Sequence, residues 1–284
     1  MPPTVAPSVA ERHPSPTPSP PGAARSDPAR APLVVIFMEN HERSSVVGSP
    51  SAPYQNEMLR RGRDYANYYG VTHPSLPNYL AFASGSTVGK ADDEIAAGEV
   101  PGTTLWDQLS AARIDWAVYE ESMPSRCYGE PAAGSAPGDY ALKHNPALPF
   151  RNVFRDSAKC ANVQPLSEMD ASDLPSFSFV TPNECSDGHS CPMTTADRWL
   201  AERVPPLVAA GADVVVTYDE GTTDAGPNGS SAGGHVFAAE IGPDVPHGAV
   251  FRQPLDHYSL LAGIEERFGL PRLGAAARAT PMPT

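Results

Sequence analysis

A serine at the start of a predicted helix is well placed to act as a nucleophile. Ser75 lies in a turn within residues 71–85 (VTHPSLPNYLAFASG), and from Asn78 onward the apolar residues follow helical spacing. The first backbone N–H groups of a helix lack intrahelical partners, and the helix dipole is positive at this end. A phosphate or sulfate ester would therefore meet hydrogen-bond donors around the hydroxyl. The alternative is that Ser75 only caps the helix, which is a common role for serine.

Polar side chains follow three runs that we expect to be buried strands. Residues 33–38 (LVVIFM) and 213–218 (DVVVTY) are continuous apolar runs, and residues 177–180 form a shorter one. The polar residues that follow these runs are Glu39 and Asn40, Asn183, and Asp219 and Glu220. A single carboxylate after a strand is usually an ordinary loop residue. Three such groups favour a shared metal or phosphate site, because ligands of α/β sheets bind beyond the carboxyl ends of the strands.

Strand patterns alternate with helical patterns along the chain, which predicts an α/β fold with a mainly parallel sheet. Further strands are expected at 116–119 and 235–241, and helices at 54–62, 103–112 and 194–210. Within the last of these helices, Thr194 and Asp197 resemble a capping box, and Pro205-Pro206 should interrupt the helix. A final helix starts near His257 and ends at Gly269.

Length, composition and charge restrict the possible classes of protein. Residues 1–31 are rich in proline and predict an extended, disordered segment, whereas residues 32–284 are long enough for one large folded domain. The net charge of -13 argues against nucleic acid as a partner. An anionic substrate would therefore need local positive charge from a metal or from protonated histidines. No run reaches the ~18 apolar residues that a membrane span requires, so stable membrane insertion is not expected.

Four cysteines permit two disulfides in three pairings. Cys185 and Cys191 bracket a short loop and are the favoured local pair, and we expect Cys127–Cys160 to close the Pro/Gly-rich region over the site. Zinc is the competing interpretation, but no C-x-x-C spacing is present. The N-terminal segment shows no signal peptide, so the protein is either cytosolic or exported after removal of an upstream signal. Disulfides favour a secreted or cell-envelope protein.

Six motifs in this order resemble the bacterial phosphoesterase family of acid phosphatases and phospholipases C, a branch of the alkaline phosphatase superfamily. They are IFMEN, THPSLPNYLAFASG, KHNP, TPNECSDGHSC, TYDEGT and GGHV, and together they cover nearly all of residues 32–284. The short length, HPSLPNY and the paired cysteines are more similar to the small secreted acid phosphatases than to the larger phospholipases. The resemblance implies a three-layer α/β/α sandwich, in agreement with the alternation of strands and helices.

The resemblance also implies a metal site. Its ligands would be Glu39, Asn40, Ser75, Asp219 and Glu220. Metal coordination favours the alkoxide of Ser75, whose hydroxyl is otherwise a poor nucleophile. Oxygen ligands suit a hard cation such as Mg, Ca or Mn better than zinc. Because Glu220 stands where two-zinc relatives carry histidine, we expect one divalent ion and no two-zinc centre.

Protein side chains would then form the second half of the site. Those implied by the resemblance are His144, Asn183, Asp187, His189 and His235. Protonated histidines would bind the phosphoryl oxygens, and His189 would donate a proton to the leaving group. Asp187 is placed to orient the His189 ring or to raise its pKa. His73 and Asn78, which flank Ser75, are further candidates for substrate binding, although helix capping is an equally good role for Asn78.

The first functional hypothesis is a metal-dependent acid phosphatase that hydrolyses small phosphate monoesters through a phosphoserine on Ser75. The alternative is a phosphodiesterase or phospholipase C using the same site, although the chain lacks the added domain of those phospholipases. A third hypothesis is a non-catalytic remnant that only binds phosphate, against which the intact set of candidate metal ligands argues. An ordinary serine hydrolase is excluded because Ser75 has no G-x-S-x-G motif. Nothing in the sequence indicates an oligomeric state.

Overall fold

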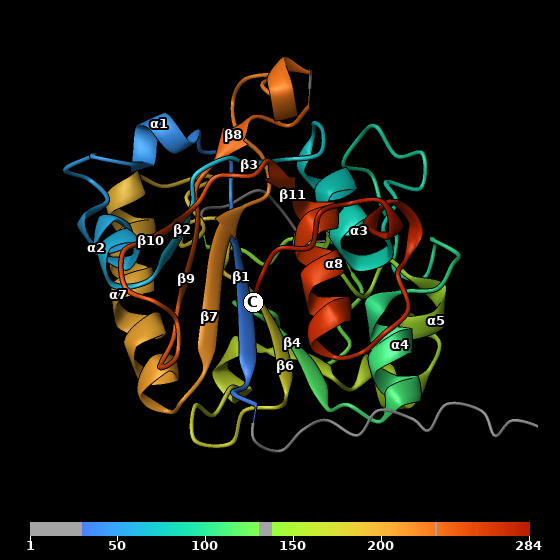
Figure 1. The fold of residues 1–284 in the computed structure, drawn as a ribbon. Coiled ribbons are helices and arrows are strands. Elements are labelled where there is room, and N and C mark those ends of the chain that lie inside the picture. Colours follow the sequence, from blue (N-terminus) through green and yellow to red (C-terminus); the bar gives the residue numbers. More distant parts are fainter. Residues whose placement is uncertain (1–29, 131–137, 231) are drawn as a thin grey trace, which may run out of the picture.

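An eight-stranded sheet forms the middle layer of the molecule, and helices cover both of its faces (Figure 1). The computed structural model describes residues 30–130, 138–230 and 232–284. The three layers confirm the predicted α/β/α sandwich. The expected disordered segment at residues 1–31 lies almost wholly outside the described residues.

The strand order in this sheet is β10-β2-β9-β7-β1-β6-β4-β5. The bounds are Leu33–Met38 for β1, Arg63–Tyr65 for β2, Trp116–Glu120 for β4, Val163–Pro165 for β5, Phe177–Thr181 for β6, Asp213–Tyr218 for β7, Ala238–Ile241 for β9 and Ala249–Phe251 for β10. Strand β1 lies between β6 and β7 and is parallel to both, with Leu33 opposite Phe177 and Asp213. The sheet is mixed, since β9 runs antiparallel to its two neighbours. The carboxyl ends of β1, β6 and β7 therefore share one edge.

The long helices divide between the two faces of the sheet. Helices α2 (Pro53–Arg61) and α7 (Met193–Ala209) cover one face, and α3 (Ser75–Ser84), α4 (Leu105–Ala112) and α8 (His257–Arg267) cover the other (Figure 1). Short helical segments are α1 (Arg43–Val46), α5 (Arg151–Phe154), α6 (Ser157–Cys160), η1 (Leu142–His144), η2 (Leu166–Glu168), η3 (Pro227–Gly229) and η4 (Gly274–Ala277). The predicted helix starts at Ser75 and at His257 are confirmed.

Aromatic packing holds helix α3 against the sheet. Phe82 of α3 lies 5.3 Å from the ring of Phe37 and 4.9 Å from the ring of Phe179, between ring centroids. Phe37 is on β1 and Phe179 on β6, so the helix rests on the two central strands. This packing fixes the height of Ser75 relative to the carboxyl edge of the sheet.

Two predictions for helix α7 are wrong. The helix continues through Pro205 and Pro206, because Val204 and Leu207 are buried in the core and tertiary packing outweighs the lost backbone hydrogen bonds. The expected capping box is also absent, since the residue before the helix is Pro192 and no side chain caps it.

Asp197 instead caps a different helix. Its two carboxylate oxygens accept hydrogen bonds from the backbone N–H groups of Tyr54 (3.0 Å) and Gln55 (2.9 Å), in the first turn of α2. The side chain is buried between the two helices. Asp197 therefore links α7 to α2, a role that spacing within α7 does not reveal.

The predicted strand at 235–241 is split between two sheets. Strand β8 (His235–Val236) pairs with β3 (Tyr68–Tyr69), which also pairs with β11 (Leu255–Asp256) in a separate three-stranded sheet. Strand β9 begins at Ala238 and joins the main sheet. His235 thereby belongs to the small sheet and not to the main sheet.

Both predicted disulfides, Cys127–Cys160 and Cys185–Cys191, are present. The first closes the excursion that contains η1, α5 and α6, and the second closes the loop that follows β6. Among the described residues, no helix is both long enough and apolar enough to cross a membrane.

The cap on α2 yields a stability test. Replacing Asp197 by Ala should lower the free energy of unfolding by about 1–2 kcal/mol, because two N–H groups in the first turn of α2 lose their acceptor. The exposed Thr194 is the control, and its replacement by Ala should change stability by no more than about 0.5 kcal/mol. Urea denaturation measures both variants. Equal losses of stability for the two variants would instead support the predicted capping box within α7.

Candidate active site

The ends of β1 and β7 and the loop that follows β6 bring four acidic side chains toward one another at the carboxyl edge of the sheet. Glu39 directly follows β1, and Asp219 and Glu220 directly follow β7. The backbone N–H of Asn40 donates to Asp219 Oδ1 over 3.1 Å, which joins the two strand ends. Asn40 has a φ of 60°, a conformation that asparagine tolerates better than most residues. Asp187 is the fourth acid, and its backbone carbonyl accepts a hydrogen bond from the N–H of Glu39 (3.0 Å).

Ser75 meets this group from the first turn of α3. Its Oγ lies 3.0 Å from Glu39 Oε2 and 3.3 Å from Glu220 Oε1, and the side chain is buried. Tyr79, four residues later on the same helix, donates its hydroxyl to the other oxygen of Glu39. The two hydroxyls thus hold both oxygens of one carboxylate. Tyr79 was not predicted as a site residue, although its spacing from Ser75 places the two on one face of the helix.

The four carboxyl groups are unfavourably close without a cation. Burial, followed by the charge of Glu220, raises the pKa of Asp219 to about 7, and burial raises the pKa of Asp187 to about 8. Burial and the charges of Asp219 and Asp187 raise the pKa of Glu39 as well. Asp187 Oδ2 and Asp219 Oδ2 are buried, with no hydrogen-bond partner among the described residues. A divalent cation would satisfy these oxygens and offset the repulsion, so the residues present fit a metal site.

Two overlapping sets of metal donors meet at Glu39. The predicted ligands Glu39, Asn40, Ser75, Asp219 and Glu220 are brought together by the contacts described above. A second set consists of Glu39, His144 and Asp187, each of which offers a ligand atom within 4.8 Å of the others. His144 Nε2 lies 3.4 Å from Glu39 Oε2, and its Nδ1 lies 3.7 Å from Asp187 Oδ2. Sequence reasoning assigned His144 and Asp187 to the substrate, and the structure makes them metal-ligand candidates too.

His144 is fully buried and stacks on Tyr79, with ring centroids 5.5 Å apart. Burial, followed by the charge of Lys143, lowers its pKa well below the ordinary value. Desolvation thus favours the neutral form of His144, which is the opposite of the effect expected from the sequence. Burial also lowers the pKa of His189, whose ring centroid lies 5.8 Å from that of His144.

Asp187 does not orient the ring of His189, contrary to expectation. Its Oδ1 accepts a hydrogen bond from the backbone N–H of His189 over 2.7 Å, and its Oδ2 faces His144. The His189 ring instead lies 3.0 Å from the hydroxyl of Ser190. The reason is the tightly bent backbone of residues 184–190, which directs the carboxylate back to the backbone and leaves the His189 ring exposed.

Asn78 holds the turn that delivers the serine. Its Oδ1 accepts from the N–H groups of Val71 (2.8 Å) and Thr72 (3.2 Å). Its Nδ2 donates to the carbonyl oxygens of Thr72 (2.8 Å) and Pro74 (3.2 Å). Both amide hydrogens are thus used within the turn, and the proposed contact with phosphate is replaced by a structural role.

Two further candidates contact groups outside the Ser75 cluster. Asn183 donates from Nδ2 to Ser122 Oγ over 3.0 Å and accepts at Oδ1 from the N–H of Cys185, so it caps the disulfide loop. His235 places Nε2 2.9 Å from the carbonyl oxygen of Ala66 in the small sheet. Neither side chain forms a described contact with Ser75 or with the four acids, because their own loops and strands provide their partners.

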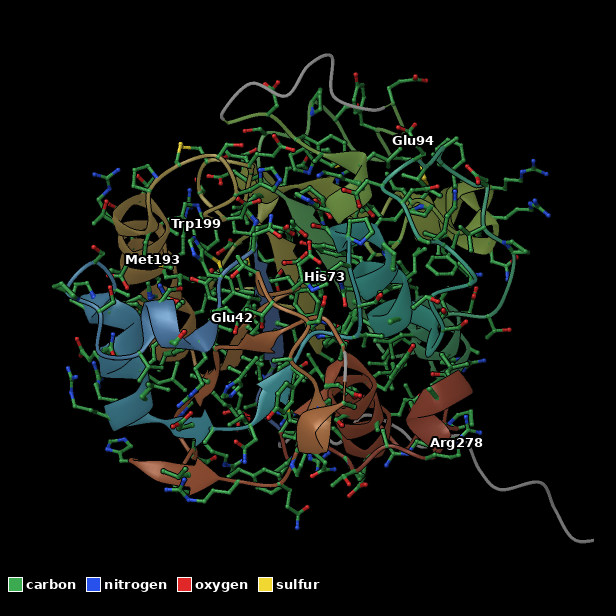
Figure 2. The ribbon with its side chains drawn as sticks, turned by 90° about the horizontal axis from the view of Figure 1, so that it is seen from above. Glu42, His73, Glu94, Met193, Trp199 and Arg278 are labelled. Atoms are coloured by element: carbon green, nitrogen blue, oxygen red, sulfur yellow. A yellow bond between two sulfur atoms is a disulfide. The ribbon has the colours of Figure 1, made fainter. Side chains whose placement is uncertain are left out.

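His73 and Glu42 hold the segment that follows Asp219. They lie near the middle of the view from above, onto the carboxyl ends of the strands (Figure 2). His73 Nδ1 bonds the carboxylate of Glu220, and its Nε2 lies 3.1 Å from the carbonyl oxygen of Thr223. These bonds outweigh partial burial and raise the pKa of His73. Glu42 Oε1 accepts from the N–H groups of Thr222 (3.1 Å) and Thr223 (3.0 Å). No sequence signal pointed to Glu42.

Comparison with solved structures supports the fold. A protein in the alkaline phosphatase superfamily from Vibrio parahaemolyticus superposes with a TM-score of 0.58 at 12% identity, over 87% of this chain and 70% of that one. Murine ectonucleotide pyrophosphatase/phosphodiesterase 5 superposes with a TM-score of 0.53 at 11% identity, over 86% of this chain and 96% of that one.

Relatives at higher identity are phosphatases by name. The phosphate-repressible acid phosphatase of Penicillium chrysogenum is 30% identical over 257 residues, 85% of this chain and 60% of that protein. The chain thus spans somewhat more than half the length of this relative. The phosphatidylinositol-3-phosphatase of Mycobacterium tuberculosis is 29% identical over 269 residues, 92% of this chain and 84% of that protein. The model of the Phosphoesterase family matches residues 37–271, which include every side chain of the site, and this chain belongs to that family.

Proposed function

We propose that this protein is a metal-dependent acid phosphatase that cleaves phosphate monoesters through a phosphoserine on Ser75. The observation that carries the proposal is the position of the Ser75 hydroxyl, buried at the start of α3 and within 3.3 Å of the carboxylates of Glu39 and Glu220. A hydroxyl among carboxylates that require a cation is suited to attack an anionic ester. Family membership and the names of the relatives support a hydrolase of phosphoric esters.

The proposed metal is one hard divalent ion, and its proposed ligands are Glu39, Asn40, Ser75, Asp219 and Glu220. Such an ion, when bound, favours the alkoxide of Ser75 and supplies positive charge to the phosphoryl group. Oxygen donors predominate in this set, which favours Mg, Ca or Mn. Tyr79 would hold Glu39 in place through its hydroxyl, and His73 would hold Glu220.

The reaction follows two displacements at phosphorus. Ser75 first loses its hydroxyl proton to solvent, and the resulting alkoxide Oγ forms a bond to phosphorus while the ester P–O bond breaks. His189, in its protonated form, donates a proton to the leaving oxygen. The neutral His189 then accepts a proton from a water molecule that attacks the phosphoserine, so that the bond from phosphorus to Ser75 Oγ breaks, phosphate leaves and the Ser75 alkoxide is restored. The exposed position of His189 allows it to reach a leaving group that points toward solvent.

A phosphoinositide is a second substrate candidate, because the Mycobacterium tuberculosis relative matches over most of its length and is named for that substrate. A panel with an aryl monoester, an inositol phosphate and the matching diesters separates this candidate from a general monoesterase and from a phosphodiesterase. Export from the cytosol is also part of the proposal and is supported by the two disulfides.

The nucleophile is tested by replacing Ser75 with Ala. Turnover should fall by at least about 10³-fold, because the covalent intermediate cannot form, while phosphate binding persists. Ser84, on the same helix with its hydroxyl bonded to the carbonyl of Leu80, is the matched control and should tolerate Ala. Steady-state hydrolysis of p-nitrophenyl phosphate measures both. Activity of the Ser75 variant within about tenfold of wild type would refute the assignment of Ser75 as the nucleophile.

The metal is tested by chelation. Treatment with EDTA should abolish activity and lower the melting temperature, because the buried carboxylates then repel one another without compensation. Addition of Mg, Ca or Mn should restore both properties. Elemental analysis gives the stoichiometry, and two tightly held zinc ions per chain would refute the proposal of a single hard ion.

The proposed role of His189 as general acid is tested with two substrates that differ in their leaving groups. Replacing His189 by Asn should lower kcat for an alkyl phosphate by about 10²-fold, the usual contribution of a general acid. The loss for p-nitrophenyl phosphate should be much smaller, since nitrophenolate leaves without protonation. The exposed His247, replaced by Asn, is the control. An equal loss for both substrates would assign His189 to binding or folding.

A further inference from the structure

The site needs a fixed positive charge besides the metal. A phosphate monoester brings two negative charges toward four buried acids, in a chain whose net charge is -13. The sequence contains three lysines, at positions 90, 143 and 159. Lys143 directly precedes His144, whose Nε2 lies 3.4 Å from Glu39 Oε2, so Lys143 is the lysine to consider at the site.

Lys143 is connected to the nucleophile through one carboxylate. Its Nζ lies 3.3 Å from Asp93 Oδ2, and Asp93 Oδ1 accepts a hydrogen bond from the backbone N–H of Leu76 over 3.0 Å. Leu76 directly follows Ser75 at the start of α3. Asp93 therefore fixes the ammonium group beside the N-terminus of the helix that carries the nucleophile. The lysine side chain is 23% exposed, so solvent reaches it.

The electrostatics also place Lys143 at the site. Burial and the charges of Asp219 and Asp187 raise the pKa of Glu39, and the charge of Lys143 opposes that rise. Next to burial, the same ammonium contributes to the lowered pKa values of His144 and His189. The charge of Lys143 therefore acts on three side chains of the site, Glu39, His144 and His189. An ammonium carries three N–H donors, and Asp93 takes one of them.

We propose that Lys143 is a substrate-binding residue that donates a hydrogen bond to a non-bridging phosphoryl oxygen, and that it makes the site prefer dianionic monoesters to monoanionic diesters. This inference rests on the proposed function and names the residue that selects its substrate class. Asp93 acts as a positioning residue for the ammonium.

The preference follows from charge. A monoester dianion presents three negatively charged or partly charged oxygens, whereas a diester presents two and bears one charge less. The attraction of a fixed ammonium scales with the charge of its partner, and charge-assisted hydrogen bonds are among the stronger ones. Replacing Lys143 should therefore weaken the binding of monoesters more than the binding of diesters.

The test compares Lys143→Met with Lys159→Met. Lys159 is a matched control, since its side chain is 22% exposed and pairs with Asp107 at 2.7 Å. For Lys143→Met, we expect kcat/KM for p-nitrophenyl phosphate to fall about 10- to 100-fold, the usual range for a charge-assisted hydrogen bond. The value for bis(p-nitrophenyl) phosphate should change by no more than about threefold, and Lys143→Arg should retain the preference for monoesters. Equal losses for both esters, or no loss for the monoester, would overturn the proposal.

Binding measured without turnover separates this inference from the proposed function. Isothermal titration of the metal-loaded protein should show that Lys143→Met weakens the binding of inorganic phosphate at least about tenfold. The binding of dimethyl phosphate should weaken much less. If the wild type hydrolyses no ester but this binding difference appears, the proposed function fails while the role of Lys143 stands. If phosphate binds the wild type and the variant equally, or binds neither, the role of Lys143 fails.

Discussion

The central constraint on this structure is the burial of four carboxylates at one edge of the sheet. Glu39, Asp187, Asp219 and Glu220 converge where β1 and β7 end, and burial raises the pKa of each. Such a cluster is costly unless cations compensate it. The side chains around the cluster stabilise it through hydrogen bonds and through positive charge.

Three hydrogen-bonded supports hold the cluster in place. Tyr79 and Ser75 bond the two oxygens of Glu39 from one face of α3, and His73 bonds Glu220. Asn78 fixes the backbone turn before Ser75 with its whole amide group. A site built on rigid elements keeps a nucleophile within hydrogen-bond distance of its neighbours, and that precision determines how fast a positioned group can react.

Positive charge at the site has two proposed sources, a divalent ion and Lys143. Burial lowers the pKa of His144, so its charged form is disfavoured at this position. A neutral imidazole can bind a metal or accept a proton, which are different tasks from holding an anion. Under this division, the metal activates the serine and the lysine selects the charge of the substrate.

The sequence alone determined the features that depend on local pattern: the buried strands β1 and β7, the helix start at Ser75, the local disulfide and the family. Only tertiary structure decided which side chains meet across the chain. Asp197 caps α2 instead of its own helix, and Asp93 joins Lys143 to α3, through contacts between distant segments. Periodicity reports which face of an element is apolar, but a hydrogen bond between distant residues depends on how the whole chain packs.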